Sequence, residues 1–257
     1  MAGEHRSINV YSLKGEVVKS IPVPNAFMRE FRPDVIRKAV SAQEANMRQP
    51  YGASKGAGMR HAVSTWGKGR GVARVQRLSQ GQRGAQSPGT VGGRRAHPPY
   101  VERDWSKKIN RKEMAVAKLS ALAAMADPEK VRERGHKFAE GITVPIVVED
   151  GIENLSKTSE VMDVLERIGI ADVERVRDGT KTRAGRGKMR GRRFRSPRGV
   201  LIVVSNEESP LLTGASNLPG VEIVTFDNLN AALMAPGGDP GRLALFSESA
   251  LNKIGEW

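Results

Sequence analysis

The chain has 257 residues, with 42 Lys and Arg against 28 Asp and Glu, and its formal net charge at pH 7 is +14. Hydrophobic residues make up 39%, which is enough for a core, but a charge of this size disfavours compaction unless a polyanion such as RNA, DNA or an acidic membrane surface neutralises it. The absence of cysteine excludes disulfides, thiolate zinc sites and cysteine nucleophiles.

The first predicted element is a hairpin near the N-terminus. Residues 8–13 and 16–21 read as its strands, and Lys14-Gly15 supplies the turn. A helix is predicted from Pro33 until Pro50 ends it. Residues 1–6 lack the apolar core of a signal peptide, and no run of 18 apolar residues occurs. We therefore expect a cytoplasmic chain with no membrane partner.

The second half of the chain alternates helices with short apolar strands. Helices are predicted over 111–125, from Pro128 behind the capping Asp127, from Ser156 or Thr158, over 229–233, and after the capping residues 247–249. Strands are predicted over 144–148, 199–204, 221–225 and 243–246. This alternation is typical of an α/β fold. We expect a three-layer domain with a mainly parallel sheet, helices on both faces and the N-terminal hairpin at the edge of the sheet.

The basic residues are concentrated in two segments. The first lies between Glu44 and Glu102, where 57 consecutive residues contain no acid. Its cations are Arg48, Lys55, Arg60, Lys68, Arg70, Arg74, Arg77, Arg83, Arg94 and Arg95. The stretch is also rich in glycine, and its few apolar residues are too scattered to form a core. We expect residues 48–105 to form a long extended loop, because connections of this length are functional or disordered.

The second basic segment spans residues 179–199. It has nine cations and no acid: Lys181, Arg183, Arg186, Lys188, Arg190, Arg192, Arg193, Arg195 and Arg198. Both segments interrupt a domain formed by residues 1–47 and 106–257. A solvated face or a disordered tail is the ordinary explanation of a charge run, but these two runs are internal and bracketed by folded elements.

Glycine and arginine together suit contact with RNA. Glycine allows the backbone to approach phosphates, and arginine offers paired donors to phosphate and a plane that stacks on bases. Trp66, Tyr51 and Tyr100 could stack on unpaired bases. Folded into a hairpin, the first segment could reach at most about 90 Å. That reach suits insertion between packed RNA helices, with ordering on binding.

Catalytic and cofactor motifs are weak by comparison. No dinucleotide fingerprint, P-loop or nucleophile elbow occurs. The histidines, His5, His61, His97 and His136, have no metal-ligand spacing. Several acids follow predicted strands, where an α/β enzyme would place its site: Glu149, Asp150, Glu153, Glu207 and Glu208. They are more simply solvated acids at the rim of the sheet, and residues 236–242 are simply a turn.

Four runs of residues, in this order, carry a specific resemblance. They are 64–74 (STWGKGRGVAR), 183–193 (RAGRGKMRGRR), 235–242 (APGGDPGR) and 248–253 (ESALNK). Over essentially its full length the chain resembles the archaeal and eukaryotic branch of the universal large-subunit ribosomal protein four family. The chain ends at Trp257 without the C-terminal extension of eukaryotic members, so we expect an archaeal source.

The resemblance implies a structural protein of the large ribosomal subunit. Its expected partners are large-subunit ribosomal RNA, neighbouring ribosomal proteins and the nascent peptide, with no enzymatic activity, cofactor, metal site or homo-oligomer. Magnesium would enter only through the RNA. The tip of the first segment, Trp66-Gly67-Lys68-Gly69-Arg70, would help line the nascent-peptide exit tunnel. The second segment would hold RNA near the globular domain.

Two other functions remain open from the residues alone. An RNA-modifying enzyme would combine an α/β catalytic domain with a basic clamp, and its globular part would bind a nucleotide or methyl donor. A DNA-packaging or regulatory protein would bind duplex DNA at least as tightly as ribosomal RNA at matched salt.

Overall fold

The computed structural model describes residues 7–255. The chain forms two compact units, which are the globular unit (residues 1–44 and 107–257) and the loop segment (residues 45–106). Within the described residues, no helix combines the length and the apolar character that a membrane span requires. His5 lies outside the described residues.

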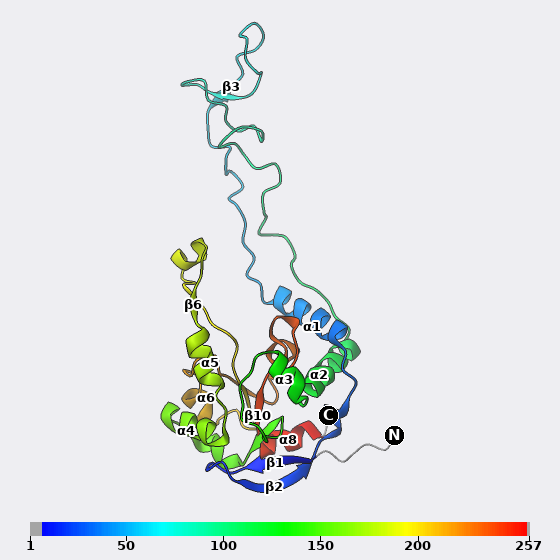
Figure 1. Cartoon of the computed structure of the whole chain (residues 1–257). Coiled ribbons are helices and arrows are strands. Elements are labelled where there is room, and N and C mark those ends of the chain that lie inside the picture. Colours follow the sequence, from blue (N-terminus) through cyan, green and yellow to red (C-terminus); the bar gives the residue numbers. More distant parts are fainter. Residues whose placement is uncertain (1–6, 256–257) are drawn as a thin grey trace. The chain divides into compact units, whose positions relative to one another are not determined.

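A six-stranded sheet forms the centre of the globular unit (Figure 1), with the strand order β2-β1-β5-β10-β8-β9. The strands are β1 (Ser7–Tyr11), β2 (Val17–Pro22), β5 (Ile146–Val148), β8 (Leu201–Val204), β9 (Glu222–Thr225) and β10 (Ala244–Ser247). Each neighbouring pair from β1 across to β9 is parallel, whereas β2 pairs antiparallel with β1. The predicted mixed α/β fold with a mainly parallel sheet is confirmed.

Both faces of the sheet are buried at its central strands β5, β8 and β10, which explains why these strands are apolar except for Ser247. Successive side chains on a strand point to opposite faces. Phe246 and Leu201 accordingly belong to one apolar cluster, whereas Leu245 and Ile202 belong to the other. All four side chains are at most 1% exposed. A sheet covered on both sides needs continuous apolar strands, because no face is left for polar residues.

The helices divide between the two clusters. Most buried residues of α1 (Pro33–Asn46), α2 (Arg111–Met125), α7 (Ala231–Met234) and α8 (Glu248–Gly255) belong to the cluster of Phe246. The exceptions, Ala42 of α1 and Ser120 and Ala124 of α2, belong to neither cluster. The buried residues of α3 (Pro128–Glu133), α4 (Thr158–Ile168), α5 (Asp172–Gly179) and α6 (Leu211–Gly214) lie on the other side, except for Gly214 of α6 and Asp172 and Val176 of α5, which belong to neither cluster. Figure 1 shows α1 and α2 on one side of the sheet and α4 and α6 on the other.

Two predicted helix caps are confirmed by hydrogen bonds. The Asp127 side chain accepts from the amide of Glu129 at the start of α3, and the Ser247 hydroxyl accepts from the amide of Ala250 at the start of α8. Helix α5 was not predicted, because its only buried apolar residues are two valines and it follows closely after α4. The described chain also has short 3-10 helices, which are η1 (Asn25–Met28), η2 (Asp150–Asn154), η3 (Arg186–Met189) and η4 (Pro236–Gly238).

The loop segment has very little regular structure. Its strands are β3 (Val63–Ser64) and β4 (Arg77–Leu78), which pair antiparallel with Val63 opposite Leu78. Ala85 is the one buried residue that the structure describes in this segment. Hydrogen bonds and short turns therefore hold the loop segment, without a hydrophobic core.

Candidate nucleic-acid interface

The loop segment concentrates positive charge that the chain itself does not neutralise. Residues 45–106 contain eleven Lys and Arg and two acids, Glu102 and Asp104. Lys55 lies 3.3 Å from Glu102, and this is the one ion pair of the segment within the described residues. The other ten cations are left to solvent, to backbone oxygens, to aromatic rings and, for Arg60, to the hydroxyl of Ser54. A polyanion is the partner that such a surface would attract.

Trp66 begins the expected tip of the loop segment, residues 66–70, and two arginines lie over its ring. The guanidinium carbons of Arg77 and Arg70 lie 5.3 Å and 5.9 Å from the centroid of its ring, within cation–π range. Gly67 and Gly69 follow with φ of 72° and 81°, and a Cβ built on either meets nothing within 4 Å. Glycine is required at these positions by the left-handed backbone and not by crowding.

Arg77 has a structural role that its charge alone did not suggest. Its guanidinium donates to the carbonyl oxygens of Gln82 at 2.5 Å and Ala73 at 3.2 Å, besides covering Trp66. It thereby joins the chain just before β4 to the chain just after it. By contrast, the side chain of Arg74 makes no hydrogen bond within the described residues and is exposed. Among the predicted contact residues, Arg74 is thus available to a ligand and Arg77 is largely engaged.

A second aromatic centre in the loop segment was missed by the sequence analysis. Arg103 and Arg48 place their guanidinium carbons 4.3 Å and 4.8 Å from the ring centroid of Trp105. Arg48 and Trp105 lie 57 positions apart in sequence, so no local pattern relates them. Tyr51 and Tyr100, which were considered for base stacking, are 73% and 53% exposed.

Residues 179–199, called the basic ribbon here, form a two-stranded hairpin in the globular unit. Strand β6 (Lys181–Thr182) pairs antiparallel with β7 (Phe194–Arg195), and η3 lies between them. Figure 1 shows this ribbon continuing beyond the end of α5. All nine of its cations are exposed, and one of them, Arg198, has a carboxylate partner among the described residues. Eight cations therefore remain without a counter-ion.

The base of the ribbon is fixed by a carboxylate. Glu222 at the start of β9 accepts hydrogen bonds from Arg198 and, at 2.5 Å, from Arg242. Arg242 is 0% exposed, and it also donates to the carbonyl oxygens of Gly199 and Leu233 at 2.9 Å and 2.8 Å. Burial lowers the pKa of Arg242, whereas Glu222 opposes that shift. A negative charge thus holds the end of a positively charged segment.

A second carboxylate, that of the buried Asp172, helps to fix the same end of the ribbon. Arg175 donates to Asp172 at 2.5 Å and, through its other nitrogen, to the carbonyl oxygen of Arg198 at 2.7 Å. Burial would raise the pKa of Asp172, but hydrogen bonds from His136 and Arg175 outweigh it and leave that pKa below its usual value. The ribbon therefore leaves the fold at a point fixed by two acids, neither of which the sequence pattern indicated.

His136 is a packing residue of this network. Its Nδ1 lies 3.0 Å from Asp172, and its side chain is 1% exposed. Burial lowers the pKa of His136, and Asp172 opposes the shift only in part. The imidazole is therefore neutral near pH 7, with Nδ1–H donating to the carboxylate. Among residues 7–255, no group of three or more His, Asp or Glu could hold a metal ion.

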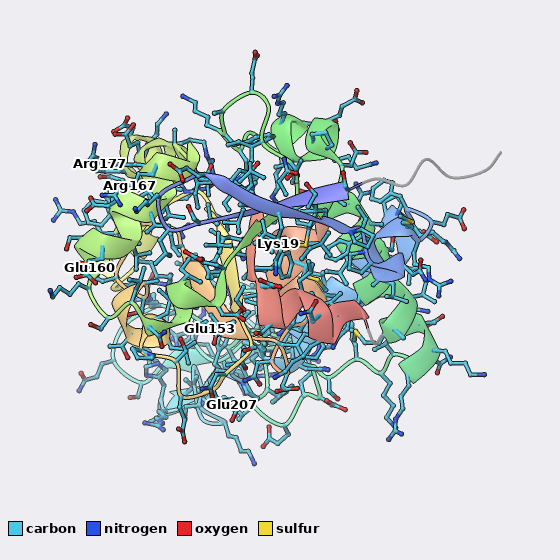
Figure 2. All side chains as sticks on the ribbon, turned by 90° about the horizontal axis from the view of Figure 1, so that it is seen from below. Lys19, Glu153, Glu160, Arg167, Arg177 and Glu207 are labelled. Carbon is cyan, nitrogen blue, oxygen red and sulfur yellow. The ribbon has the colours of Figure 1, made fainter. Side chains whose placement is uncertain are left out.

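The acids at the carboxyl ends of the strands stabilise the fold. Glu153, labelled in Figure 2, accepts from the amide of Ser205 at 2.7 Å and the hydroxyl of Ser247 at 2.6 Å. Asp150 accepts from the amide of Ser249 at 2.8 Å, and Glu149 from that of Leu13 at 2.9 Å. The expectation that these acids are simply solvated was incomplete, because they join strand ends to neighbouring turns. Glu207 and Glu208 are exposed.

The turn over residues 236–242 also does more than was expected. Arg134 donates to the carbonyl oxygens of Pro236 at 2.9 Å and Pro240 at 3.3 Å. Arg242, at the end of the turn, supplies the buried guanidinium of the ribbon network. The position of Arg242 directly before the apolar run that forms β10 was the one signal in the sequence that this arginine is buried.

Comparison with known proteins gives a consistent result over nearly the whole chain. A model of the ribosomal protein L4/L1 family matches residues 21–257. The large ribosomal subunit protein uL4 of Archaeoglobus fulgidus is 47% identical over 249 residues, covering 96% of this chain and 98% of its own. Those of Methanocaldococcus jannaschii and Thermoplasma acidophilum are 47% and 43% identical, and each alignment covers 96% or more of this chain and 97% of the relative.

The first prediction concerns Glu222. In Glu222→Gln the buried Arg242 loses its charged partner, so the free energy of unfolding should fall by about 3 kcal/mol. Urea unfolding followed by circular dichroism measures this. Glu207→Gln changes the charge equally at an exposed position and should leave the midpoint unchanged. Equal midpoints for the two variants would show that Glu222 does not stabilise the network.

The second prediction concerns His136. Because its pKa is lowered in the folded protein, the unfolded chain binds a proton near pH 6.5 that the folded chain does not. Stability should therefore decline as the pH falls from 7 toward 5, by at most about 1.4 kcal/mol per pH unit. The lowered pKa of Asp172 also stabilises the folded protein, and this contribution to stability is lost only below about pH 3.8.

The variant His136→Asn keeps a donor toward Asp172 without titrating near neutral pH, so its stability should vary less between pH 7 and 5. His97→Asn at an exposed position is the matched control and should keep the wild-type slope. Identical slopes for wild type and His136→Asn, measured by urea unfolding at each pH, would contradict the assignment.

Proposed function

Because the chain belongs to the ribosomal protein L4/L1 family, we propose that it is a structural constituent of the large ribosomal subunit that binds large-subunit ribosomal RNA and supports assembly. The relatives at 43–47% identity carry the name of a large-subunit ribosomal protein, not of an enzyme. On this proposal the protein works in the cytoplasm as part of the ribosome, contacts neighbouring ribosomal proteins and catalyses no reaction.

The distribution of charge is the observation that supports RNA binding most strongly. Outside the loop segment and the basic ribbon, the chain has 22 Lys and Arg and 26 Asp and Glu, so the rest is net negative. All the excess positive charge therefore lies in two exposed segments. Phosphate groups lower the free energy of such segments by neutralising them and releasing counter-ions. RNA is favoured over duplex DNA because the loop segment offers aromatic and glycine-rich surface suited to irregular, unpaired regions.

The loop tip is proposed to contribute to the wall of the nascent-peptide exit tunnel. Residues 67–70 are exposed, their glycines adopt a left-handed backbone, and Lys68 has no ion pair within the described residues. Glycine alternates with the cations Lys68 and Arg70, which keeps the backbone of the tip thin and suits a narrow passage that a peptide must cross. Magnesium would act through the RNA and not through a site of the protein.

The basic ribbon gives the sharpest test of RNA binding. In the triple variant Arg186→Gln, Lys188→Gln, Arg190→Gln, three exposed cations without ion pairs are removed. The slope of log affinity for large-subunit ribosomal RNA against log salt should become shallower by roughly 2–3, since each phosphate contact contributes about 0.7–0.9. Filter binding of the full chain at several salt concentrations measures this.

The matched control removes three exposed cations elsewhere in the globular unit, in the variant Lys14→Gln, Lys137→Gln, Arg167→Gln. Its charge change is the same, so a slope close to wild type is expected. If both variants lose the same slope, binding depends on net charge and not on the ribbon. If the wild-type chain binds duplex DNA at least as tightly as ribosomal RNA at matched salt, the proposed function is wrong.

A further inference from the structure

The loop segment contains a cavity of about 420 Å³. Its lining combines apolar, polar and basic side chains, namely Met59, Thr65, Arg74, Val75, Gln76, Gln86, Ser87, Pro88 and Arg94. All of them belong to the loop segment. A cavity of this volume is at the lower end of the range for sites of small organic ligands. It is therefore large enough for one small molecule or one residue of a polymer.

Gln86 holds this cavity open by an unusual conformation. It is the one non-glycine residue with positive φ (61°) in the described chain. Such a backbone is strained for a residue with a Cβ atom and persists only where other contacts fix it. Here Nε2 of Gln86 donates to the carbonyl oxygens of Met59 and His61, both at 2.9 Å. These bonds join chain stretches about 25 residues apart. The side-chain oxygen of Gln86, Oε1, has no hydrogen-bond partner in the described chain.

Several other polar groups of the lining are also uncommitted. The side chains of Thr65, Arg74 and Gln76 make no hydrogen bond within the described residues, and the one bond of the Arg94 guanidinium is a long 3.5 Å contact to the carbonyl oxygen of Arg95. Residues 45–101 contain no acid, so neither guanidinium of the cavity has a carboxylate near it in sequence. The cavity therefore presents two cations without an ion pair in the described residues, beside amide, hydroxyl and apolar groups.

We propose that this cavity binds a single unpaired nucleotide of the RNA, an inference that rests on the proposed function. The base would lie against the apolar side chains of Met59, Val75 and Pro88, and the amides of Gln76 and Gln86 would bond its edge. The phosphate would lie between Arg74 and Arg94, whose guanidinium groups suit paired contacts with phosphate oxygens. An anion site would not need the apolar wall, and a purely apolar ligand would not need two arginines.

The test uses the full chain with ¹³C-labelled methionine methyl groups. Adenosine 5′-monophosphate and ribose 5-phosphate are titrated separately at low salt and followed by nuclear magnetic resonance. A base against Met59 places an aromatic ring near its methyl group, so the nucleotide should cause a saturable upfield shift there. Ribose 5-phosphate should not cause it. Met189, exposed in the basic ribbon, serves as the internal control for binding by charge alone.

A pair of variants ties the shift to the cavity. Gln86→Ala removes the two bonds that fix the cavity and should weaken the Met59 response to the nucleotide roughly tenfold. Gln82→Ala changes an exposed glutamine of the same segment, whose side chain has no partner in the described residues, and should leave the response intact. Equal responses of the two variants would overturn the proposal.

The proposal is also overturned if ribose 5-phosphate shifts Met59 as much as the nucleotide does, because the cavity would then be an anion site. It is overturned equally if Met59 does not shift at nucleotide concentrations that shift Met189. Neither result affects the salt dependence of binding to ribosomal RNA, so failure of the cavity and failure of the proposed function can be told apart.

Discussion

Repulsion among cations that the chain does not pair is the constraint on which the rest of the structure depends. The loop segment has eleven cations and two acids around one buried residue, so hydrophobic burial cannot offset this repulsion. Its internal structure relies on arginines bonded to backbone carbonyls, on rings such as Trp66, and on the strained Gln86. Such contacts define a shape without providing much stability, which suits a segment that completes its folding on RNA.

The globular unit solves the opposite problem, because it must fix the point where a charged ribbon leaves a fold. Two acids do this work. Glu222 and Asp172 hold Arg242 and Arg175, and both arginines bond the backbone at residues 198 and 199. An unpaired carboxylate near an RNA-binding segment would repel phosphate and weaken binding. Here the arginines that bond to Glu222 and Asp172 neutralise the charges of these two acids. The acids at the opposite ends of the strands, such as Glu153, similarly join strands to turns.

The sequence predicted what depends on local patterns. The apolar runs of β8 and β10, helix α2 and the caps at Asp127 and Ser247 follow from periodicity and capping chemistry. It could not predict contacts between distant residues, such as Arg48 with Trp105 or Arg242 with Glu222, because no local signal relates the partners. The same limit applies to the candidate interface. Composition located both basic segments, but only the folded structure distinguishes the exposed Arg74, which makes no hydrogen bond in the described residues, from the engaged Arg77.

The central claim is that contacts with RNA, and not a hydrophobic core, supply most of the stability of the loop segment. Amide hydrogen exchange over residues 60–95, measured for the free protein and for the protein within the assembled large subunit, tests it most directly. The account predicts partial protection in the free protein, where local contacts such as the two Gln86 bonds form, and much stronger protection in the subunit, while strands β5, β8 and β10 are protected in both. Equal protection of residues 60–95 in the two states, or fast exchange within the subunit, would contradict it.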